Sequence, residues 1–216
     1  MISSSDLMKA LRQAGRWVPF LKSVCLYFVV GGGAPSLSAA ALKCAPVLCL
    51  LLCVLLRAYN APYPQREYAR RVATGLALSA AGDALLVWPQ HLVAGMGAFA
   101  AAHVAYIRAF GMRPAATRAG ALLYAGAVLY AVAVPAPGAL AALVPAYALL
   151  LATMAWRGAA SAGYQRGGAL LFLLSDAILG YSLFAGSVPY TQTLVMSTYY
   201  LGQLGIALSA LEPRAC

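Results

Sequence analysis

One stretch of this chain decides its fold class: residues 167–184 read GGALLFLLSDAILGYSLF. Asp176 is the only charged residue in it. As a helix the stretch would be roughly 27 Å long, close to the 30 Å of a bilayer's hydrocarbon core. An apolar run of this length predicts a transmembrane helix with one buried acid.

The composition of the whole chain supports the same class. Of 216 residues, 63% are hydrophobic and 9% are charged, and the mean hydropathy is +0.80. Soluble domains carry about 25% charged residues, and a soluble chain of this size could not bury so much apolar surface. Disordered chains are polar and charge-rich. The composition therefore predicts an all-α integral membrane protein with a single domain.

Eight apolar stretches of suitable length predict a bundle of eight transmembrane helices. They cover residues 17–33, 37–56, 72–88, 92–107, 119–134, 139–156, 167–184 and 190–211. Glycine and proline mark the short connections, and the runs are too long and too uniformly apolar for porin strands. We expect a tail at 1–16, a membrane domain at 17–211 and a tail at 212–216.

The basic residues predict the orientation of the bundle. Of the 15 lysines and arginines, 13 lie before the first span, after the last, or in alternate loops between spans. They are Lys9, Arg12, Arg16, Arg57, Arg66, Arg70, Arg71, Arg108, Arg113, Arg118, Arg157, Arg166 and Arg214. The positive-inside rule then places both termini in the cytosol, as an even number of spans also requires. The positive-inside rule thus accounts for the net charge of +10, and nucleic acid is not an expected partner. The first span resembles a signal peptide, but its removal would break this alternation, so we interpret it as retained.

Two acids lie inside predicted spans, Asp83 in the third and Asp176 in the seventh. Ionisable groups within the hydrocarbon layer are costly and are functional candidates by default. Counted from the nearest basic residue, Asp83 lies roughly 18 Å and Asp176 roughly 15 Å from the cytosolic edge. The same count places other polar side chains in this layer: Lys43, Tyr199, Tyr200 and Gln203. His103 is shallower, with Tyr106 one turn further along the same face.

One lysine cannot neutralise two carboxylates in a medium of low dielectric constant. We therefore expect one carboxyl to stay protonated beside an ionised one, an arrangement suited to acid-catalysed cleavage of acetal-like bonds. Two alternatives stay open at this point. Each Asp could form only a structural pair with Lys43, and His103 could be only a hydrogen-bonding link between helices.

Motifs for other kinds of chemistry are missing from the sequence. With two histidines, one in a loop, we expect no catalytic metal site. No serine-nucleophile elbow and no phosphate-cradling glycine loop occurs. The prediction is carboxylate chemistry with no cofactor.

Six stretches carry most of these polar residues: 42–50, 82–89, 95–106, 155–158, 168–176 and 198–203. Their order and spacing resemble the lysoplasmalogenase family of membrane proteins, also called YhhN-like, and especially its vertebrate members. The resemblance implies an eight-helix enzyme of the endoplasmic reticulum that cleaves the vinyl ether bond of lysoplasmalogens. The products would be a fatty aldehyde and glycerophosphoethanolamine or glycerophosphocholine.

The resemblance also implies roles for residues. The catalytic pair would be Asp83 and Asp176. Substrate-binding or supporting residues would be Lys43, His103, Tyr106, Tyr200 and Gln203, and the depth count adds Tyr199 to them. The expected partners are a lysophospholipid substrate and membrane lipid, while a homodimer is left open. The position of His103 favours entry of lipid from the cytosolic side.

The sequence is also compatible with three rival interpretations. An intramembrane aspartyl protease also pairs two aspartates, but the residues before Asp83 and Asp176 do not resemble that class. A proton-coupled transporter could use the two carboxylates as proton carriers. A purely structural bundle is the third alternative.

Overall fold

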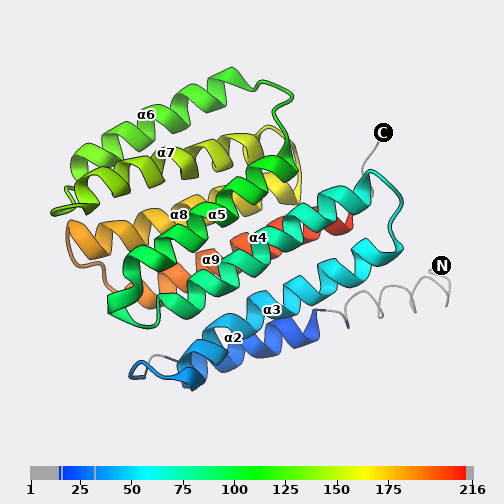
Figure 1. Ribbon diagram of the computed structural model, residues 1–216, viewed down its shortest axis with the longest axis horizontal. Helices are drawn as coiled ribbons and strands as arrows, with labels where there is room; N and C mark the ends of the chain where they lie inside the picture. Colours follow the sequence, from blue (N-terminus) through cyan, green and yellow to red (C-terminus); the bar gives the residue numbers. More distant parts are fainter. Residues whose placement is uncertain (1–14, 16, 32, 213–216) are drawn as a thin grey trace, which may run out of the picture.

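The computed structural model describes residues 15, 17–31 and 33–212, and its regular elements are helices (Figure 1). Within these ranges the chain forms eight α-helices and a short 3-10 helix, and no strand. They are α2 (Val18–Val30), α3 (Leu37–Asn60), α4 (Gln65–Leu85), η1 (Pro89–His91), α5 (Leu92–Phe110), α6 (Thr117–Ala133), α7 (Leu140–Ala159), α8 (Tyr164–Phe184) and α9 (Thr191–Leu211). Each predicted span falls on one helix, and the predicted all-α class is confirmed.

The helix that carries Asp83 differs most from its predicted bounds. It begins at Gln65, seven residues before the predicted start at 72. The start of an apolar run marks where a span enters the membrane. The helix itself can begin earlier, because charged residues can also be helical. The first turns of α4 are charged and still helical, and Arg71 forms an i,i+4 ion pair of 3.0 Å with Glu67.

The protein is a multi-pass membrane protein. Five helical segments in the described part of the chain are long and apolar enough to cross a membrane: Leu37–Tyr59, Pro89–Phe110, Leu140–Ala159, Tyr164–Phe184 and Thr191–Leu211. Large apolar side chains lie exposed on the outside of the bundle, where lipid would cover them. The other three α-helices are α2 and α6, of 13 and 17 residues, and the charge-bearing α4. The number of crossings, eight, stays a prediction.

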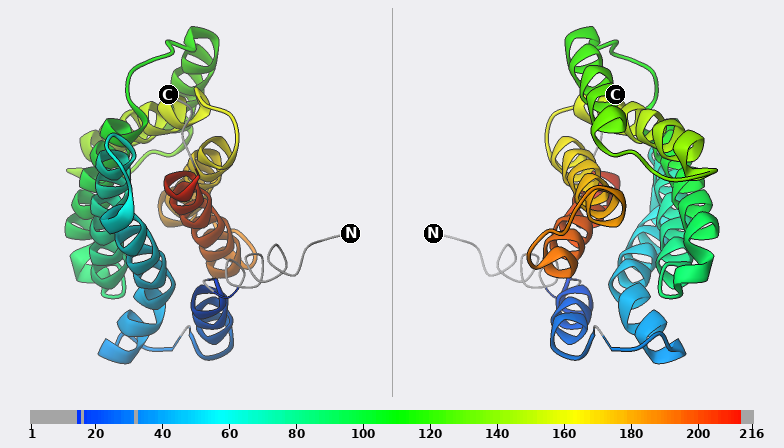
Figure 2. Two further views of the ribbon diagram at one scale, coloured as in Figure 1. Left: turned by 90° about the vertical axis from the view of Figure 1, so that its right-hand side faces the viewer. Right: turned by 90° about the vertical axis from the view of Figure 1, so that its left-hand side faces the viewer.

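The helices pack in two layers, as the end-on views of Figure 2 show. One layer holds α3, α4, α5 and α7, and the other holds α2, α9 and α8. Helix α6 lies at the edge and packs against α7. The two acids come from different layers, Asp83 from α4 and Asp176 from α8.

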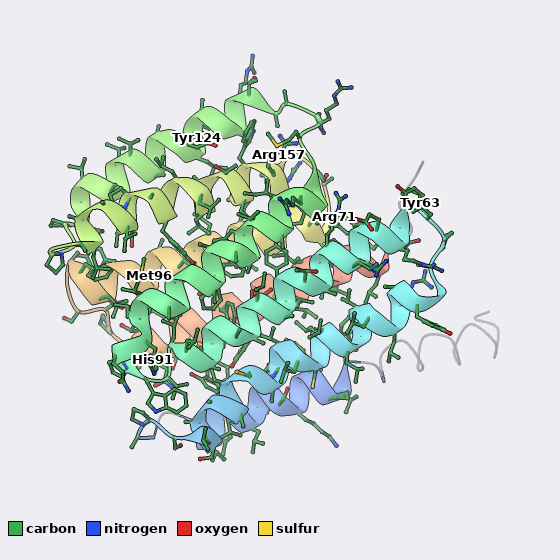
Figure 3. All side chains as sticks on the ribbon, viewed as in Figure 1. Tyr63, Arg71, His91, Met96, Tyr124 and Arg157 are labelled. Atoms are coloured by element: carbon green, nitrogen blue, oxygen red, sulfur yellow. The ribbon has the colours of Figure 1, made fainter. Side chains whose placement is uncertain are left out.

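Loops rich in basic residues meet at one end of this bundle. Arg71 of α4 donates to the backbone oxygen of Arg108 at 2.8 Å, and Arg157 of α7 donates to that of Gly111 at 2.6 Å. Figure 3 shows Arg71 and Arg157 at this end and His91 at the opposite one. We call the first the basic end. Lys9, Arg12, Arg16 and Arg214 lie outside the described residues, as do the two predicted tails apart from residues 15 and 212.

Glycines bring α8 and α9 into backbone contact, which fixes Asp176 relative to the polar residues of α9. A Cβ atom on Gly168 would lie 2.6 Å from the backbone nitrogen of Ile206. One on Gly202 would lie 2.9 Å from the backbone nitrogen of Phe172. Small residues permit such close approach of membrane helices.

This contact predicts that substitution of two adjacent glycines, Gly167 and Gly168, affects stability differently. Gly168→Val should lower the free energy of unfolding by about 3 kcal/mol, because the new side chain overlaps backbone atoms that cannot move aside. Gly167→Val should change it little, since nothing lies within 4 Å of a Cβ there. Thermal unfolding of both variants in detergent measures the effect. Equal stability of the two variants would contradict the packing described.

Candidate active site

A cavity of about 270 Å³ lies between the two helix layers, and both Asp83 and Asp176 line it. Lys43 and Tyr199 also lie on its wall. The rest of the wall is mostly apolar and comes from α4 to α9; examples are Leu86, Met96, Phe99, Leu123, Leu151, Leu173 and Val195. The structure thus brings together Lys43, Asp83, Asp176 and Tyr199, four of the residues singled out from the sequence.

Asp83 is held by two neighbours. The hydroxyl of Tyr199 donates to its Oδ2 at 2.6 Å, and the ammonium of Lys43 lies 3.9 Å from its Oδ1. The side chain of Asp83 is 3% exposed and that of Lys43 is 17% exposed. An acid so deeply buried is stabilised in its ionised form by an adjacent cation and a hydroxyl donor. Asp83 therefore has the partners that an ionised carboxylate needs.

Asp176 is held differently, at the end of a hydrogen-bonded chain. The hydroxyl of Tyr147 donates to its Oδ2 at 2.6 Å. The Nε2 atom of His103 lies 3.0 Å from that hydroxyl and 3.5 Å from Oδ2. Since the Tyr147 proton points to Asp176, the hydroxyl oxygen must accept from His103, so Nε2 carries the histidine proton. The chain from His103 through Tyr147 therefore fixes the orientation of the Asp176 carboxyl.

Four of the residues predicted for the site, His103 among them, do not line the cavity. Tyr106 donates to Oε1 of Gln203 at 2.7 Å, and both side chains are fully buried in the core. Tyr200 donates to the backbone oxygen of Lys43 at 2.8 Å. It therefore supports the segment of α3 that carries Lys43. These residues lie behind the wall of the cavity.

Comparison with known proteins gives the family. The sequence profile of the YhhN family matches residues 38–210, from α3 to α9. The chain belongs to the YhhN family. It is 40% identical to human lysoplasmalogenase TMEM86B, over 91% of this chain and 87% of the relative. It is 41% identical to the pig protein of the same name, over 92% and 88%. It is 37% identical to bovine lysoplasmalogenase TMEM86A, over 99% and 95%. No solved structure matches the chain.

Membership in this family confirms the resemblance drawn from the sequence. It also bears on the rival interpretations, because these relatives are named as enzymes. The transporter alternative gains no support from them.

Sequence reasoning missed Tyr147, the residue that connects Asp176 to His103. A signal was available. Tyr147 precedes Arg157 by ten residues, which places it roughly 15 Å from the basic end, in the same layer as Asp176. Depth alone does not give the rotation of α7, so it could not show that Tyr147 faces Asp176.

The cavity lies nearer to the end of the bundle opposite the basic end. Asp83 is two residues from the last residue of α4, and Asp176 is eight from the last residue of α8. Both helices begin at the basic end. The layer of polar residues is therefore displaced from the middle of these helices, away from the basic loops.

The arrangement supports acid and base chemistry on an apolar molecule. Within the described ranges no three His, Cys, Asp or Glu side chains lie close enough to hold a metal ion. The reactive groups on the wall are two carboxyl groups in different settings, one beside a lysine and one at the end of a tyrosine–histidine chain. Such a pair can protonate one atom of a substrate and activate water at another.

Proposed function

We propose that this YhhN-family protein hydrolyses the vinyl ether bond of lysoplasmalogens. The products are a fatty aldehyde and glycerophosphoethanolamine or glycerophosphocholine. One observation carries the proposal: two aspartates with different partners line a single apolar cavity inside a membrane bundle. The names of its relatives, lysoplasmalogenases at 37–41% identity, support the same substrate.

The cavity suits a lipid with one chain. Its wall is apolar except at Lys43, Asp83, Tyr130, Tyr147, Ser175, Asp176 and Tyr199. An alkenyl chain can lie along the apolar wall, while its first two carbons, which form the vinyl ether, reach the carboxyl groups. A second acyl chain would need further apolar space, so we expect the lyso form as the substrate.

Asp176 is the proposed acid. Its carboxyl proton is transferred to the β-carbon of the vinyl ether, and the electron pair of the double bond forms the new C–H bond. Positive charge then spreads over the α-carbon and the ether oxygen. The hydrogen bond from Tyr147, whose hydroxyl is in turn held by His103, orients the Asp176 carboxyl for this transfer.

Asp83 is the proposed base. Its carboxylate stabilises the cation and removes a proton from water as the water oxygen bonds to the α-carbon. The resulting hemiacetal collapses: Asp83 returns its proton to the glycerol oxygen, the carbon–oxygen bond breaks, and Asp176 recovers a proton from the hemiacetal hydroxyl. One water is consumed and both carboxyl groups return to their first state.

We further propose that the chain crosses the membrane of the endoplasmic reticulum eight times with both termini in the cytosol. The arginines of alternate loops meet at one end of the bundle, as the positive-inside rule requires of a cytosolic face. Helices α2 and α6 are short for a span, so their crossing requires local thinning of the bilayer or contact with other helices. The assignment to the endoplasmic reticulum rests on the family resemblance.

Tyr147→Phe tests the chain that leads to Asp176. The variant keeps the ring but removes the hydroxyl that joins Asp176 to His103, so we expect the rate of aldehyde release to fall about 100-fold. Tyr124→Phe is the matched control, because Tyr124 also loses a hydrogen bond of 2.7 Å, to Thr153, but does not line the cavity (Figure 3). Equal activity of the two variants would contradict a role for the chain.

One comparison separates an enzyme from a transporter. Purified protein in detergent, with no membrane gradient, should release aldehyde from a 1-alkenyl lysophospholipid. It should leave a 1-acyl lysophospholipid intact, because an ester has no vinyl double bond to protonate. Activity that appeared only in sealed vesicles with a proton gradient would favour the transporter and refute the proposal.

A further inference from the structure

A second cavity lies beside the first one at the end of the bundle opposite the basic loops. It has a volume of about 570 Å³ and shares part of its wall with the inner cavity, including Lys43, Leu86 and Met196. The remaining wall includes Tyr27 of α2, Trp88 before η1 and Gln192 in the first turn of α9. We call this space the vestibule.

Lys43 lies between the two spaces. Its side chain lines the vestibule on one side and the inner cavity on the other, and its ion pair with Asp83 is long, at 3.9 Å. No other lysine or arginine, and no acid, lines the vestibule in the described part of the chain. A phosphate that entered the vestibule would therefore meet one cation, next to the proposed base.

Aromatic and amide groups line the outer part of the vestibule. Trp88 is half-buried on its wall. Gln192 donates to the hydroxyl of Tyr27 at 3.1 Å, and this bond joins α9 to α2 across the vestibule. An indole ring is the best of the aromatic side chains at binding an ammonium group through its face. The vestibule thus offers a cation for a phosphate and an aromatic wall for an amine.

These two features match the order of groups in the substrate. Three glycerol carbons separate the vinyl ether oxygen from the phosphate oxygen, and the amine follows the phosphate. With the vinyl ether at Asp83 and Asp176, the phosphate falls near Lys43 and the amine falls beyond it. The inner cavity continues the other way, toward Leu122 and Gly126 of α6 and Leu151 of α7, where only the hydrocarbon tail can lie.

We propose that the vestibule is the binding site for the zwitterionic head group of the substrate, with Lys43 for the phosphate and Trp88 for the amine. The head group then points away from the basic end, toward the non-cytosolic face. This orientation is opposite to the cytosolic entry expected from the position of His103. The inference rests on the proposed function, because it assumes that the reactive bond lies between the two aspartates.

Binding of a stable analogue tests the site without turnover. The probes are 1-O-alkyl lysophosphocholine, whose saturated ether cannot be cleaved by this mechanism, and 1-O-alkylglycerol, which has no head group. Trp88→Leu should weaken binding of the lysophosphocholine by the full-length protein in detergent about tenfold and leave binding of the alkylglycerol unchanged. Gln192→Ala is a milder change at an exposed position. It should weaken binding of the lysophosphocholine about threefold and leave binding of the alkylglycerol unchanged.

Arg118→Ala is the control at the other end of the bundle. Arg118 is exposed and lines a separate hollow with Arg166 at the basic end, so a phosphate bound there would be lost in this variant. We expect Arg118→Ala to leave the binding of both probes unchanged. The vestibule site would be overturned if Arg118→Ala weakened binding of the lysophosphocholine and Trp88→Leu did not. It would also be overturned if Trp88→Leu weakened binding of both probes equally.

Aldehyde release separates failure of this inference from failure of the proposed function. Wild-type protein that binds the lysophosphocholine in the vestibule but releases no aldehyde from its 1-alkenyl counterpart would refute the enzyme and keep the head-group site. Aldehyde release with no effect of Trp88→Leu or Gln192→Ala on binding would keep the enzyme and refute the site.

Discussion

Asp176→Asn is expected to lower aldehyde release about 1,000-fold while the protein stays folded. Asparagine has nearly the shape of aspartic acid, and its amide oxygen can still accept the hydrogen bond from Tyr147, now 2.6 Å from Oδ2. It has no acidic proton to give to the β-carbon. The expected signature is a loss of kcat with unchanged binding of 1-O-alkyl lysophosphocholine. Activity within tenfold of wild type would remove Asp176 from the mechanism.

Asp83→Asn is expected to lose both activity and stability. It leaves the ammonium of Lys43 beside the cavity without its carboxylate, 3.9 Å away in the native protein. Removal of one partner from a buried pair costs several kcal/mol. Because Lys43 is 17% exposed, we expect the free energy of unfolding to fall by less than for a fully buried pair, about 2 kcal/mol. Thermal unfolding in detergent measures the loss of stability.

The double variant Asp83→Asn with Lys43→Met separates these two effects. It removes the unpaired cation, so the unfolding temperature should return toward that of wild type, while aldehyde release stays about 1,000-fold reduced because the base is missing. Recovered activity in the double variant would show that Asp83 acts only as the partner of Lys43. That outcome would favour the structural interpretation weighed from the sequence.

The helices could be predicted from the sequence because their signal is local. Each apolar run had to become a helix, since a membrane leaves no other partner for its backbone groups. The start of α4 could not be found in this way, because the charged turn at Glu67 and Arg71 is helical but lies outside the apolar run.

Part of the candidate site could also be predicted, for a physical reason. Burying Lys43, Asp83 and Asp176 in an apolar span is too costly without partners, so charge alone identified them. In the structure these three side chains line one cavity. Their roles in a reaction stay a proposal.

Neutral residues were harder to place, because helix rotation decides which way they face and sequence depth does not give it. Tyr199 lies on the cavity wall, but the next residue, Tyr200, bonds to the backbone of α3. Tyr147 was missed for the same reason, although it lies at the matching depth. The vestibule depends on the meeting of Tyr27, Trp88 and Gln192 from three distant segments, which no local pattern reveals.

One measurement tests the central claim most directly: aldehyde release by purified wild-type protein and by folded Asp83→Asn and Asp176→Asn variants, each in detergent without a gradient. The substrates are a 1-alkenyl lysophospholipid and its saturated 1-alkyl counterpart. We predict aldehyde from the vinyl ether alone, and only with both aspartates present. Aldehyde release that persists in both variants, or none from folded wild-type protein loaded with the lipid, would contradict the account.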